Sequence, residues 1–328
     1  MRMGIGLRLA TLLMRYGNRH ARFCGHDCNT PSFIQHHNDQ PSIATKRAFD
    51  DGPSFFQRFE GTLSPHDFSA TDLLDIGSGC GGRTAYYLRY GNPRSIVGLD
   101  ISELRASIAR RSVELLCADR RIYFTVGIGE QLPFRDESFD AIVSYDVFEH
   151  VKDLDCVLEE CYRVLRSGGR LYSLFPPYYG PRAHHLDFIT TLPFLHHVFA
   201  PSVLVEAANK ILQEQPSLRD IPLPKPGLSY LGREVLPRLN GTTERDFRRI
   251  VGRLPFEVEQ LKLVPFGSGT GGLGRRAVRL FCRVMLTLPV PFTRDVFAST
   301  IRCVLKKRET IRARPVAGGT PELLRGPS

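Results

Sequence analysis

The chain has 328 residues, of which 42% are hydrophobic and 24% are charged. This hydrophobic share can bury a substantial core, so the composition excludes an intrinsically disordered chain, and the length allows one large domain or two smaller ones. The 44 Lys and Arg exceed the 34 Asp and Glu, which gives a formal net charge of +10. Because the arginines are scattered among apolar residues, we interpret this charge as solvated surface and not as a nucleic-acid-binding patch.

The first part of the chain, residues 1–70, is expected to form an N-terminal extension that caps the following domain. Residues 1–17 are apolar with basic residues among them, and we expect them to pack on the domain, with contact to a membrane surface as the alternative. They lack the long apolar core of a signal peptide, and no segment of the chain is evidently a transmembrane span. Residues 55–60 are expected to form an amphipathic helix just ahead of the core.

The cysteines and histidines bear on disulfides and metals. The eight cysteines show no paired framework, which is typical of reduced thiols and predicts a cytoplasmic protein. Cys24 and Cys28 flank His26 at a spacing that zinc sites allow, but no second ligand pair completes the set. We therefore predict no metal and interpret this segment as a loop with incidental histidines.

A glycine-rich turn follows the first predicted strand of the core. Residues 72–76 are short, apolar and bounded by turn formers, which predicts a buried strand, and residues 83–90 predict a helix closed by Gly-Asn-Pro. Residues 77–82, between them, contain four glycines. Glycine allows a left-handed backbone and the close approach of a ligand, which the N–H groups at the helix start would face.

Two classes of ligand compete for this turn. Gly77, Gly79 and Gly82 have the spacing of the dinucleotide fingerprint. Gly77, Gly79 and Gly81 fit the looser glycine turn of methyltransferases that use S-adenosylmethionine (SAM). Asp100 ends the next predicted strand, and an acid at that place suits the ribose hydroxyls of either ligand. The turn alone therefore does not decide.

The surrounding residues favour a ligand without phosphate. Asp75 stands just before the glycines, where a carboxylate suits an ammonium group better than a pyrophosphate. Residues 131–140 precede a predicted strand at 141–145, and the sequence Glu-His-Val at 149–151 follows that strand.

A helix and a further strand complete the alternating pattern. Apolar residues repeat at helical spacing from Leu154 to Leu165. Gly168 and Gly169 are expected to end this helix in a left-handed conformation, before a strand that reaches Phe175. The alternation of strands and helices predicts a parallel sheet flanked by helices.

This ordered set of motifs, over roughly 71–186, resembles the class I SAM-dependent methyltransferases, in the broad group that acts on small molecules. The resemblance implies an α/β fold: a Rossmann-like doubly wound sheet of seven strands, the last antiparallel, with an N-terminal cap and a helical lid insertion. It also implies SAM as the cofactor. We expect the SAM-binding core at 71–178, a lid or acceptor insertion at 179–254, the final strands with an insertion at 255–308, and a disordered tail at 309–328.

The resemblance implies a set of cofactor-binding residues. Asp75 would meet the methionine ammonium, Asp100 both ribose hydroxyls, and Glu130 would lie along the adenine. A helix-capping role before Ser102 is the alternative for Asp100. Ile128 departs from the family pattern, because many members carry there an Asp that contacts the adenine amino group. The implied residues are Asp75, Gly77, Ser78, Gly79, Gly81, Asp100, Ile101, Ile128, Gly129, Glu130 and Ser144.

Methyl transfer sometimes needs a general base, and the predicted lid offers histidines. His185 and His196 match a Gly-Pro-x-x-x-His-Leu segment and a Pro-aromatic-x-His segment of related small-molecule methyltransferases. Both are therefore predicted as catalytic, with His185 facing the acceptor hydroxyl. The alternative is that they pin the lid by hydrogen bonds. His184 is a third candidate, and His150, at a predicted helix start, is interpreted as structural.

The predicted acceptor is a small molecule, most simply a hydroxyl of a sugar, glycolipid or secondary metabolite. Residues 175–178 resemble the Asp/Asn-Pro-Pro-Tyr/Phe motif of DNA amino-methyltransferases. However, Phe175 offers no acceptor side chain, and the motif follows the fifth strand instead of the fourth. Tyr178 and Tyr179 are expected to line the acceptor pocket instead. An NAD-dependent oxidoreductase, a non-catalytic SAM-binding protein and an RNA methyltransferase remain as alternatives, and the oligomeric state stays open.

Overall fold

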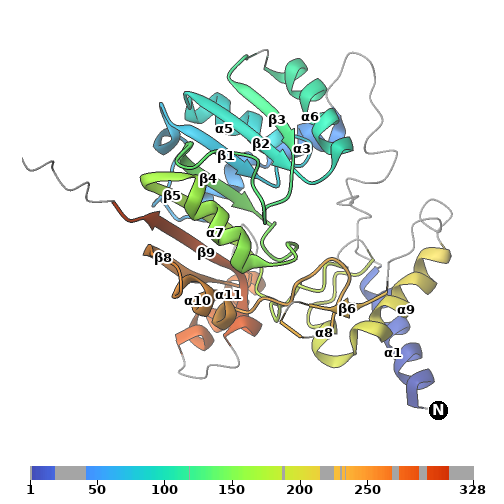
Figure 1. The fold of residues 1–328 in the computed structure, drawn as a ribbon. Helices are drawn as coiled ribbons and strands as arrows, with labels where there is room; N and C mark the ends of the chain where they lie inside the picture. Colours follow the sequence, from blue (N-terminus) through green and yellow to red (C-terminus); the bar gives the residue numbers. More distant parts are fainter. Residues whose placement is uncertain are drawn as a thin grey trace, which may run out of the picture.

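A seven-stranded sheet forms the centre of the molecule (Figure 1). The computed structural model describes residues 2–18, 42–117, 119–186, 189–214, 225–229, 231–232, 234–267, 273–287 and 294–309. The strands follow the order β3-β2-β1-β4-β5-β9-β8 across the sheet. Their bounds are β1 (Asp72–Ile76), β2 (Ser95–Asp100), β3 (Ile122–Val126), β4 (Phe139–Tyr145), β5 (Leu165–Phe175), β8 (Phe256–Pro265) and β9 (Ala298–Lys307).

All strands of this sheet except β9 run in the same direction. β1 pairs in parallel with β2 and β4, and the parallel ladder continues to β3 on one side and to β5 on the other. β9 is antiparallel to both of its neighbours, β5 and β8. The predicted seven-stranded, doubly wound sheet with an antiparallel last strand is confirmed. The carboxyl ends of the parallel strands, where ligands bind in such sheets, therefore meet at one edge.

Helices cover both faces of the sheet and connect its strands (Figure 1). Their bounds are α1 (Arg2–Asn18), α3 (Ile43–Asp50), α4 (Gly52–Gln57), α5 (Gly82–Gly91), α6 (Glu103–Leu116), α7 (Leu154–Val164), α8 (Leu195–Val198), α9 (Pro201–Gln213), α10 (Glu244–Val251) and α11 (Leu273–Thr287), with short 3₁₀ turns at η1 (Pro65–Phe68) and η2 (Asp295–Phe297). A second, small sheet pairs β6 (Gly227–Leu228) with β7 (Glu234–Val235).

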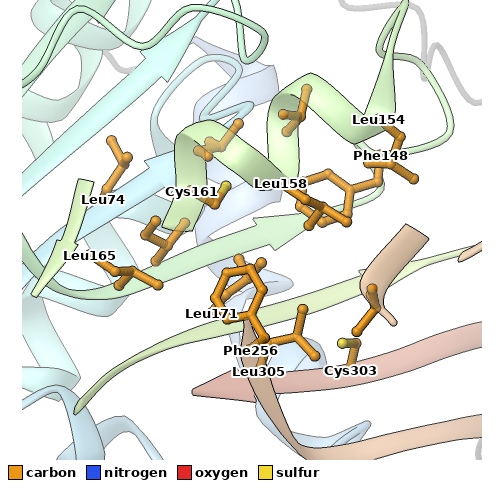
Figure 2. Packing of buried hydrophobic residues seen from close by; sticks show 14 of the residues in the cluster. Leu74, Phe148, Leu154, Leu158, Cys161, Leu165, Leu171, Phe256, Cys303 and Leu305 are labelled. Carbon is orange, nitrogen blue, oxygen red and sulfur yellow. The ribbon is translucent and has the colours of Figure 1, made fainter. Parts of the chain in front are cut away.

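The face of the sheet under α7 and α10 carries a mixed aliphatic and aromatic core. Figure 2 shows Leu154, Leu158 and Cys161 of α7 packed over the strands that carry Leu74 and Leu171. The predicted amphipathic helix is thereby confirmed, and Asp153 caps its start with its side chain. Because burying one leucine is worth roughly 1.5–3 kcal/mol, this apolar stripe holds α7 on the sheet.

The opposite face of the sheet carries an aromatic core. Phe55, Phe56, Phe68 and Tyr87 belong to one buried cluster, in which Phe56 lies 5.6 Å from Phe68 and 5.7 Å from Tyr87 between ring centroids. The helix predicted over residues 55–60 begins earlier in the chain, as α4. It brings its phenylalanines under α5, so that aromatic rings fill the space between the N-terminal segment and the sheet.

The N-terminal helix packs on the region after β5. α1 and α9 lie side by side, away from the sheet (Figure 1). Ala10 and Met14 of α1 are buried in one cluster with Leu204 and Ala208 of α9. The N-terminal helix thus contacts the predicted lid. The proposed domain boundaries stay a prediction, and no helix among the described residues is long and apolar enough to cross a membrane.

Two sequence predictions fall on residues outside the described part of the chain. The segment with Cys24, His26 and Cys28 lies within 19–41, and the predicted tail continues through 310–328. The six cysteines that the structure does describe are free thiols.

The predicted helix stop at Gly168 and Gly169 is wrong. α7 ends at Val164, and the next residue, Leu165, is already extended and begins β5. The two glycines lie inside this strand, where Gly168 has a φ of +79° and the register with β4 shifts. The pairing of Leu165 with Phe139 across the sheet ends the helix earlier than the local sequence indicates.

Helix α3 crosses the glycine turn at close range. A Cβ on Gly82 would lie 2.1 Å from the carbonyl oxygen of Thr45 and 2.7 Å from the backbone nitrogen of Phe49. The Thr45 hydroxyl donates a hydrogen bond of 2.8 Å to the carbonyl of Cys80 in the turn. The backbone of α3 therefore occupies the space that any side chain at residue 82 would need.

Gly82→Ala is expected to lower the free energy of unfolding by about 1–3 kcal/mol, the usual range for overpacking. Helix propensity would favour Ala by at most about 1 kcal/mol, and the clash is with backbone atoms that cannot rotate away. Chemical denaturation measures the difference. Gly227→Ala is the control, because nothing lies within 4 Å of a Cβ there. Equal stability of the two variants would contradict the close packing of α3.

Candidate functional site

The glycine turn between β1 and α5 borders open space at one residue. Gly77, Gly79 and Gly81 have φ angles of +78°, +55° and +79°, which residues with a side chain rarely adopt. A Cβ on Gly77 would meet Val147 at 2.2 Å, and one on Gly81 would meet Phe124 at 2.7 Å. Nothing lies within 4 Å of a Cβ on Gly79. The backbone is thus accessible at Gly79, as a cradle for a ligand requires.

Asp100 is buried at the carboxyl end of β2 and supports this turn. Its carboxylate accepts the N–H of Gly79 at 3.0 Å and the N–H of Ser102 at 2.9 Å. Ser102, and not Asp100, is the N-cap of α6, because its hydroxyl accepts the N–H of Arg105. Each carboxylate oxygen retains a second lone pair, so Asp100 can still accept hydroxyl groups.

Asp75 lies at the same edge, near the end of β1. It is buried and accepts the hydroxyl of Thr84, from α5, at 2.6 Å. Burial raises the pKa of its carboxyl to about 7, and the Thr84 hydrogen bond and the charge of Arg83 offset this rise only in part. A cation bound beside Asp75 would favour the charged carboxylate. This environment suits the ammonium group that the sequence analysis places there.

Other predicted cofactor residues border the same edge. Ser78 and Ser144 have buried hydroxyls that lack a hydrogen-bond partner among the residues described. Ile101 and Ile128 are 69% and 42% exposed, which leaves apolar surface uncovered. We call the edge formed by Asp75, Ser78, Gly79, Asp100 and Ser144, with Ile101 and Ile128, the cofactor crevice. Its unsatisfied hydroxyls and open glycine backbone fit a polar ligand with an apolar part.

Glu130 contacts the turn before α7. One oxygen of its carboxylate accepts the N–H of Lys152 at 2.7 Å and the N–H of Asp153 at 3.3 Å. A Cβ on Gly129, the preceding residue, would lie 3.2 Å from Val157 of α7. Because backbone N–H groups ahead of a helix need acceptors, Glu130 supports the start of α7, and its place along the adenine stays a prediction.

A second group of polar side chains follows β4. Glu149 is 5% exposed, and neither of its carboxylate oxygens has a hydrogen-bond partner within the described part of the chain. The Nε2 atoms of His150 and His185 lie 3.7 Å and 3.9 Å from the same oxygen, Oε1. Glu149 has no role among the sequence predictions. Its meeting with His185, which lies beyond β5, depends on the tertiary fold.

Burial sets the protonation of this group. Burial, with the nearby charge of Asp146 as a second cause, raises the pKa of Glu149 well above its ordinary value. Burial also lowers the pKa of His185 and, less strongly, that of His150. Both imidazoles are therefore neutral near pH 7 and offer a lone pair to a proton or a cation.

Glu149 and His185 share a small pocket, which we call the polar pocket. It is lined by Glu149, Pro176, Tyr178, Ala183, His185, Leu239, Asn240, Gly241 and Thr242. The Asn240 amide donates to the carbonyls of Phe148 at 2.6 Å and Val151 at 3.0 Å, and its backbone N–H donates to the Glu149 carbonyl at 2.9 Å. Asn240 thus fixes the lid to the loop that carries Glu149, a role that no local sequence pattern marks.

The other lid histidines differ from His185. His184 accepts the N–H of Leu186 at Nδ1, and its Nε2 lies 3.0 Å from the Leu192 carbonyl, so both ring nitrogens pin the lid. His196 does not line the polar pocket, but its ring centroid lies 6.0 Å from that of Tyr178, which does. Tyr179 is 37% exposed and lies outside the lining.

The loop after β4 connects the cofactor crevice with the polar pocket. Val147, which occupies the space beside Gly77, lies in the same short loop as Glu149 and His150. The structure therefore brings His185 to the loop that contacts the glycine turn.

The central part of the chain is similar to known proteins. Residues 74–173 match the family model described as a methyltransferase domain. The chain is 34% identical to methyltransferase GfsG of Streptomyces halstedii over 99 residues. These residues make up 30% of this chain and 35% of that protein. It is also 31% identical to a fatty-acid O-methyltransferase of Mycolicibacterium smegmatis over 113 residues. These residues make up 34% of this chain and 40% of that protein. The chain thus spans less than half the length of either relative.

Solved structures resemble the chain over a larger part of its length. A Haloferax volcanii complex of the Trm112 methyltransferase activator with a methyltransferase has a TM-score of 0.47 and 17% identity, over 81% of this chain and 94% of that one. The family match covers β1 to β5 of the sheet described above. Residues 74–173 are thus similar to a methyltransferase domain.

Asp75→Asn is expected to stabilise the protein at neutral and alkaline pH. The pKa of Asp75 in the folded protein, about 7, lies above its ordinary value of 3.8. Its contribution to stability is therefore complete at pH values below the ordinary pKa and is lost as the pH rises through 7. Thermal unfolding should show a higher Tm for the variant at pH 8, and the difference should shrink as the pH falls from 7 to 4. A difference that does not change with pH would contradict the raised pKa.

Proposed function

We propose that the chain is a SAM-dependent methyltransferase that acts on an oxygen of a small, partly apolar molecule. The observation that carries this proposal is that the loop after β4 connects the two parts of the site: its Val147 packs against Gly77 of the glycine turn, and its Glu149 lies 3.9 Å from His185 in the polar pocket. The methyltransferase domain at residues 74–173 supports the choice of cofactor. The lining of the pocket supports the choice of acceptor.

The cofactor crevice fits SAM, which when bound supplies an activated methyl group on a sulfonium. Asp75 would face the ammonium group, and Asp100 would accept the ribose hydroxyls through charge-assisted hydrogen bonds. The unsatisfied hydroxyl of Ser78 is available to the polar part of the ligand. Ile101 and Ile128 offer the adenine an apolar contact, which agrees with the absence of an acidic residue at position 128.

The polar pocket favours a hydroxyl on an apolar scaffold. Pro176, Tyr178 and Ala183 provide its apolar wall, and Glu149 with His185 provides its polar end. An acceptor hydroxyl held there would lie against the carboxyl group of Glu149 and the neutral imidazole of His185, both of which can form a hydrogen bond with it. The similarity to a fatty-acid O-methyltransferase supports an oxygen acceptor on a lipid-like molecule, alongside the sugar, glycolipid or secondary metabolite that the sequence suggests.

Orientation matters more than proton removal in such a site. Holding two reactants in line can contribute on the order of 7–11 kcal/mol. A general base adds roughly 10²–10⁴-fold to the rate. The network of Asn240, which fixes the lid to the loop of Glu149, is therefore the feature that would place the acceptor.

Calorimetric titration of the purified protein with SAM, with its demethylated product and with NAD tests the cofactor. We expect SAM and the product to bind and NAD not to bind. Binding of NAD alone, or of none of the three, would contradict the proposal. Methyl transfer is then assayed on a panel of fatty acids, glycolipids and hydroxylated metabolites. SAM binding without transfer to any of them would favour a non-catalytic SAM-binding protein.

Asp100→Asn is expected to weaken SAM binding roughly 10- to 100-fold, the loss that accompanies removal of a charged hydrogen-bond acceptor. The amide oxygen can still accept the N–H of Gly79, so the turn should stay folded. Asp136→Asn is the matched control, because Asp136 precedes β4 at the opposite edge of the sheet and pairs with Arg163. Wild-type affinity in Asp100→Asn would place the cofactor elsewhere.

A further inference from the structure

We propose that Glu149, His150 and His185 bind a divalent transition-metal ion, with Zn²⁺ as the favoured ion, at the polar end of the pocket. No metal is expected from the sequence alone. Binding of the ion stands on the geometry of these three side chains alone. Its role in holding the acceptor oxygen rests on the proposed function and deepens it.

The three side chains converge on one point. Oε1 of Glu149 lies 3.7 Å from Nε2 of His150 and 3.9 Å from Nε2 of His185, and one ligand atom of each residue lies within 4.8 Å of the others. In a tetrahedral zinc site with bonds of about 2.0–2.1 Å, neighbouring ligand atoms lie roughly 3.3 Å apart. The two distances from Glu149 therefore need to shorten by only about half an ångström around an ion, and the distance between the two imidazole nitrogens, which is at most 4.8 Å, by up to about 1.5 Å.

The carboxylate of Glu149 lacks any other compensation. It is 5% exposed, both oxygens lack hydrogen-bond partners, and no Lys or Arg among the described residues lies within ion-pair distance. An unpaired buried carboxylate is costly, and removing it from water is tolerated only with a partner. The Nε2 atoms of both imidazoles lie near the same oxygen, Oε1, but too far away for a hydrogen bond. A single proton on the carboxyl group could form a hydrogen bond to only one imidazole, whereas a cation between the three side chains would bind all of them.

Neighbouring hydrogen bonds hold the side chains of the cluster in an orientation that suits metal binding. Nδ1 of His150 lies 2.7 Å from the Arg238 carbonyl, an acceptor, so Nδ1 carries the proton and Nε2 keeps its lone pair toward Glu149. This arrangement is the one in which a second hydrogen bond orients a metal-binding histidine. Asn240 fixes the backbone on both sides of Glu149 through the carbonyls of Phe148 and Val151.

The ligand set selects the kind of ion. Two imidazoles and one carboxylate suit Zn²⁺ and other first-row transition metals, whereas Mg²⁺ and Ca²⁺ prefer oxygen ligands throughout. Three protein ligands leave a coordination position open. Glu149 and His185 both line the polar pocket, so the open position is available to an oxygen bound there.

The ion would serve methyl transfer by making the acceptor oxygen a better nucleophile. A hydroxyl bound to the metal loses its proton to water more readily than a free hydroxyl does. The oxygen then forms the bond to the methyl carbon, the carbon–sulfur bond of SAM breaks, and its electron pair stays on sulfur. His185 would thus act as a metal ligand in place of the general base that the sequence predicts.

The test is a Zn²⁺ titration of chelator-treated, metal-free protein in competition with a chromophoric chelator. We expect wild type to bind Zn²⁺ at least 10-fold more tightly than Glu149→Gln and His185→Asn. Asn is chosen at position 185 because the backbone there has a φ of +53°, which Asn tolerates. The double variant Cys24→Ser/Cys28→Ser, which removes the thiols of the other candidate zinc segment, should bind like wild type.

A second readout guards against loss of folding. Circular dichroism checks each variant, and Co²⁺ in place of Zn²⁺ should give the visible absorption of a four-coordinate site in wild type and lose it in Glu149→Gln. Folded Glu149→Gln and His185→Asn proteins that bind Zn²⁺ as tightly as wild type would overturn the proposed site.

The role of the ion is separated from the proposed function by titrating SAM into the metal-free protein. SAM binding without Zn²⁺, with methyl transfer restored by Zn²⁺, supports both proposals. SAM binding and full transfer in the metal-free protein would overturn the role of the ion and leave the methyltransferase proposal standing. Zn²⁺ binding in a protein that does not bind SAM would overturn the proposed function and leave the metal site standing.

Discussion

The packed glycine turn is the constraint on which both parts of the site depend. Val147 fills the space beside Gly77 on one side, and the backbone of Thr45 in α3 fills the space beside Gly82 on the other. A turn confined on two sides is open only at Gly79, which is where the cofactor crevice lies. The contact of Val147 with Gly77 also packs the loop after β4, which carries Glu149, against the turn.

The wall of the polar pocket is assembled from segments that are far apart in the chain. The Tyr178 N–H donates to the Thr242 carbonyl at 2.9 Å, which joins the segment after β5 to the segment before α10. Asn240 joins the latter to the loop after β4 through three hydrogen bonds. Each such bond contributes only about 0.5–1.5 kcal/mol, but leaving the buried amide of Asn240 unsatisfied would cost more. The three segments should consequently keep one arrangement.

Local patterns in the sequence predicted the sheet and the positions of Asp75 and Asp100, because alternating strands and helices place their carboxyl ends at one edge whatever the details of packing. The same patterns did not predict the local structures that depend on a partner far away in the sequence. Gly168 and Gly169 are compatible with a helix end and with an irregular strand, and the pairing of Leu165 with Phe139 selects the strand. Asn240 and the contact of Glu149 with His185 could not be predicted, since both arise from how the lid folds back onto the loop after β4.

Asp75 and Glu149 share one physical situation at the carboxyl ends of adjacent strands. Both are buried carboxyl groups, at β1 and after β4, in a protein that carries an excess of positive charge elsewhere. Asp75 keeps one compensating hydrogen bond, from Thr84, and Glu149 keeps none among the residues described. Burial without a cation is unfavourable for each of them, so each gains most from a positively charged ligand. In the proposed complex the SAM ammonium would compensate Asp75 and the metal ion would compensate Glu149. The two cations would then stabilise two acids that follow neighbouring strands of one sheet edge.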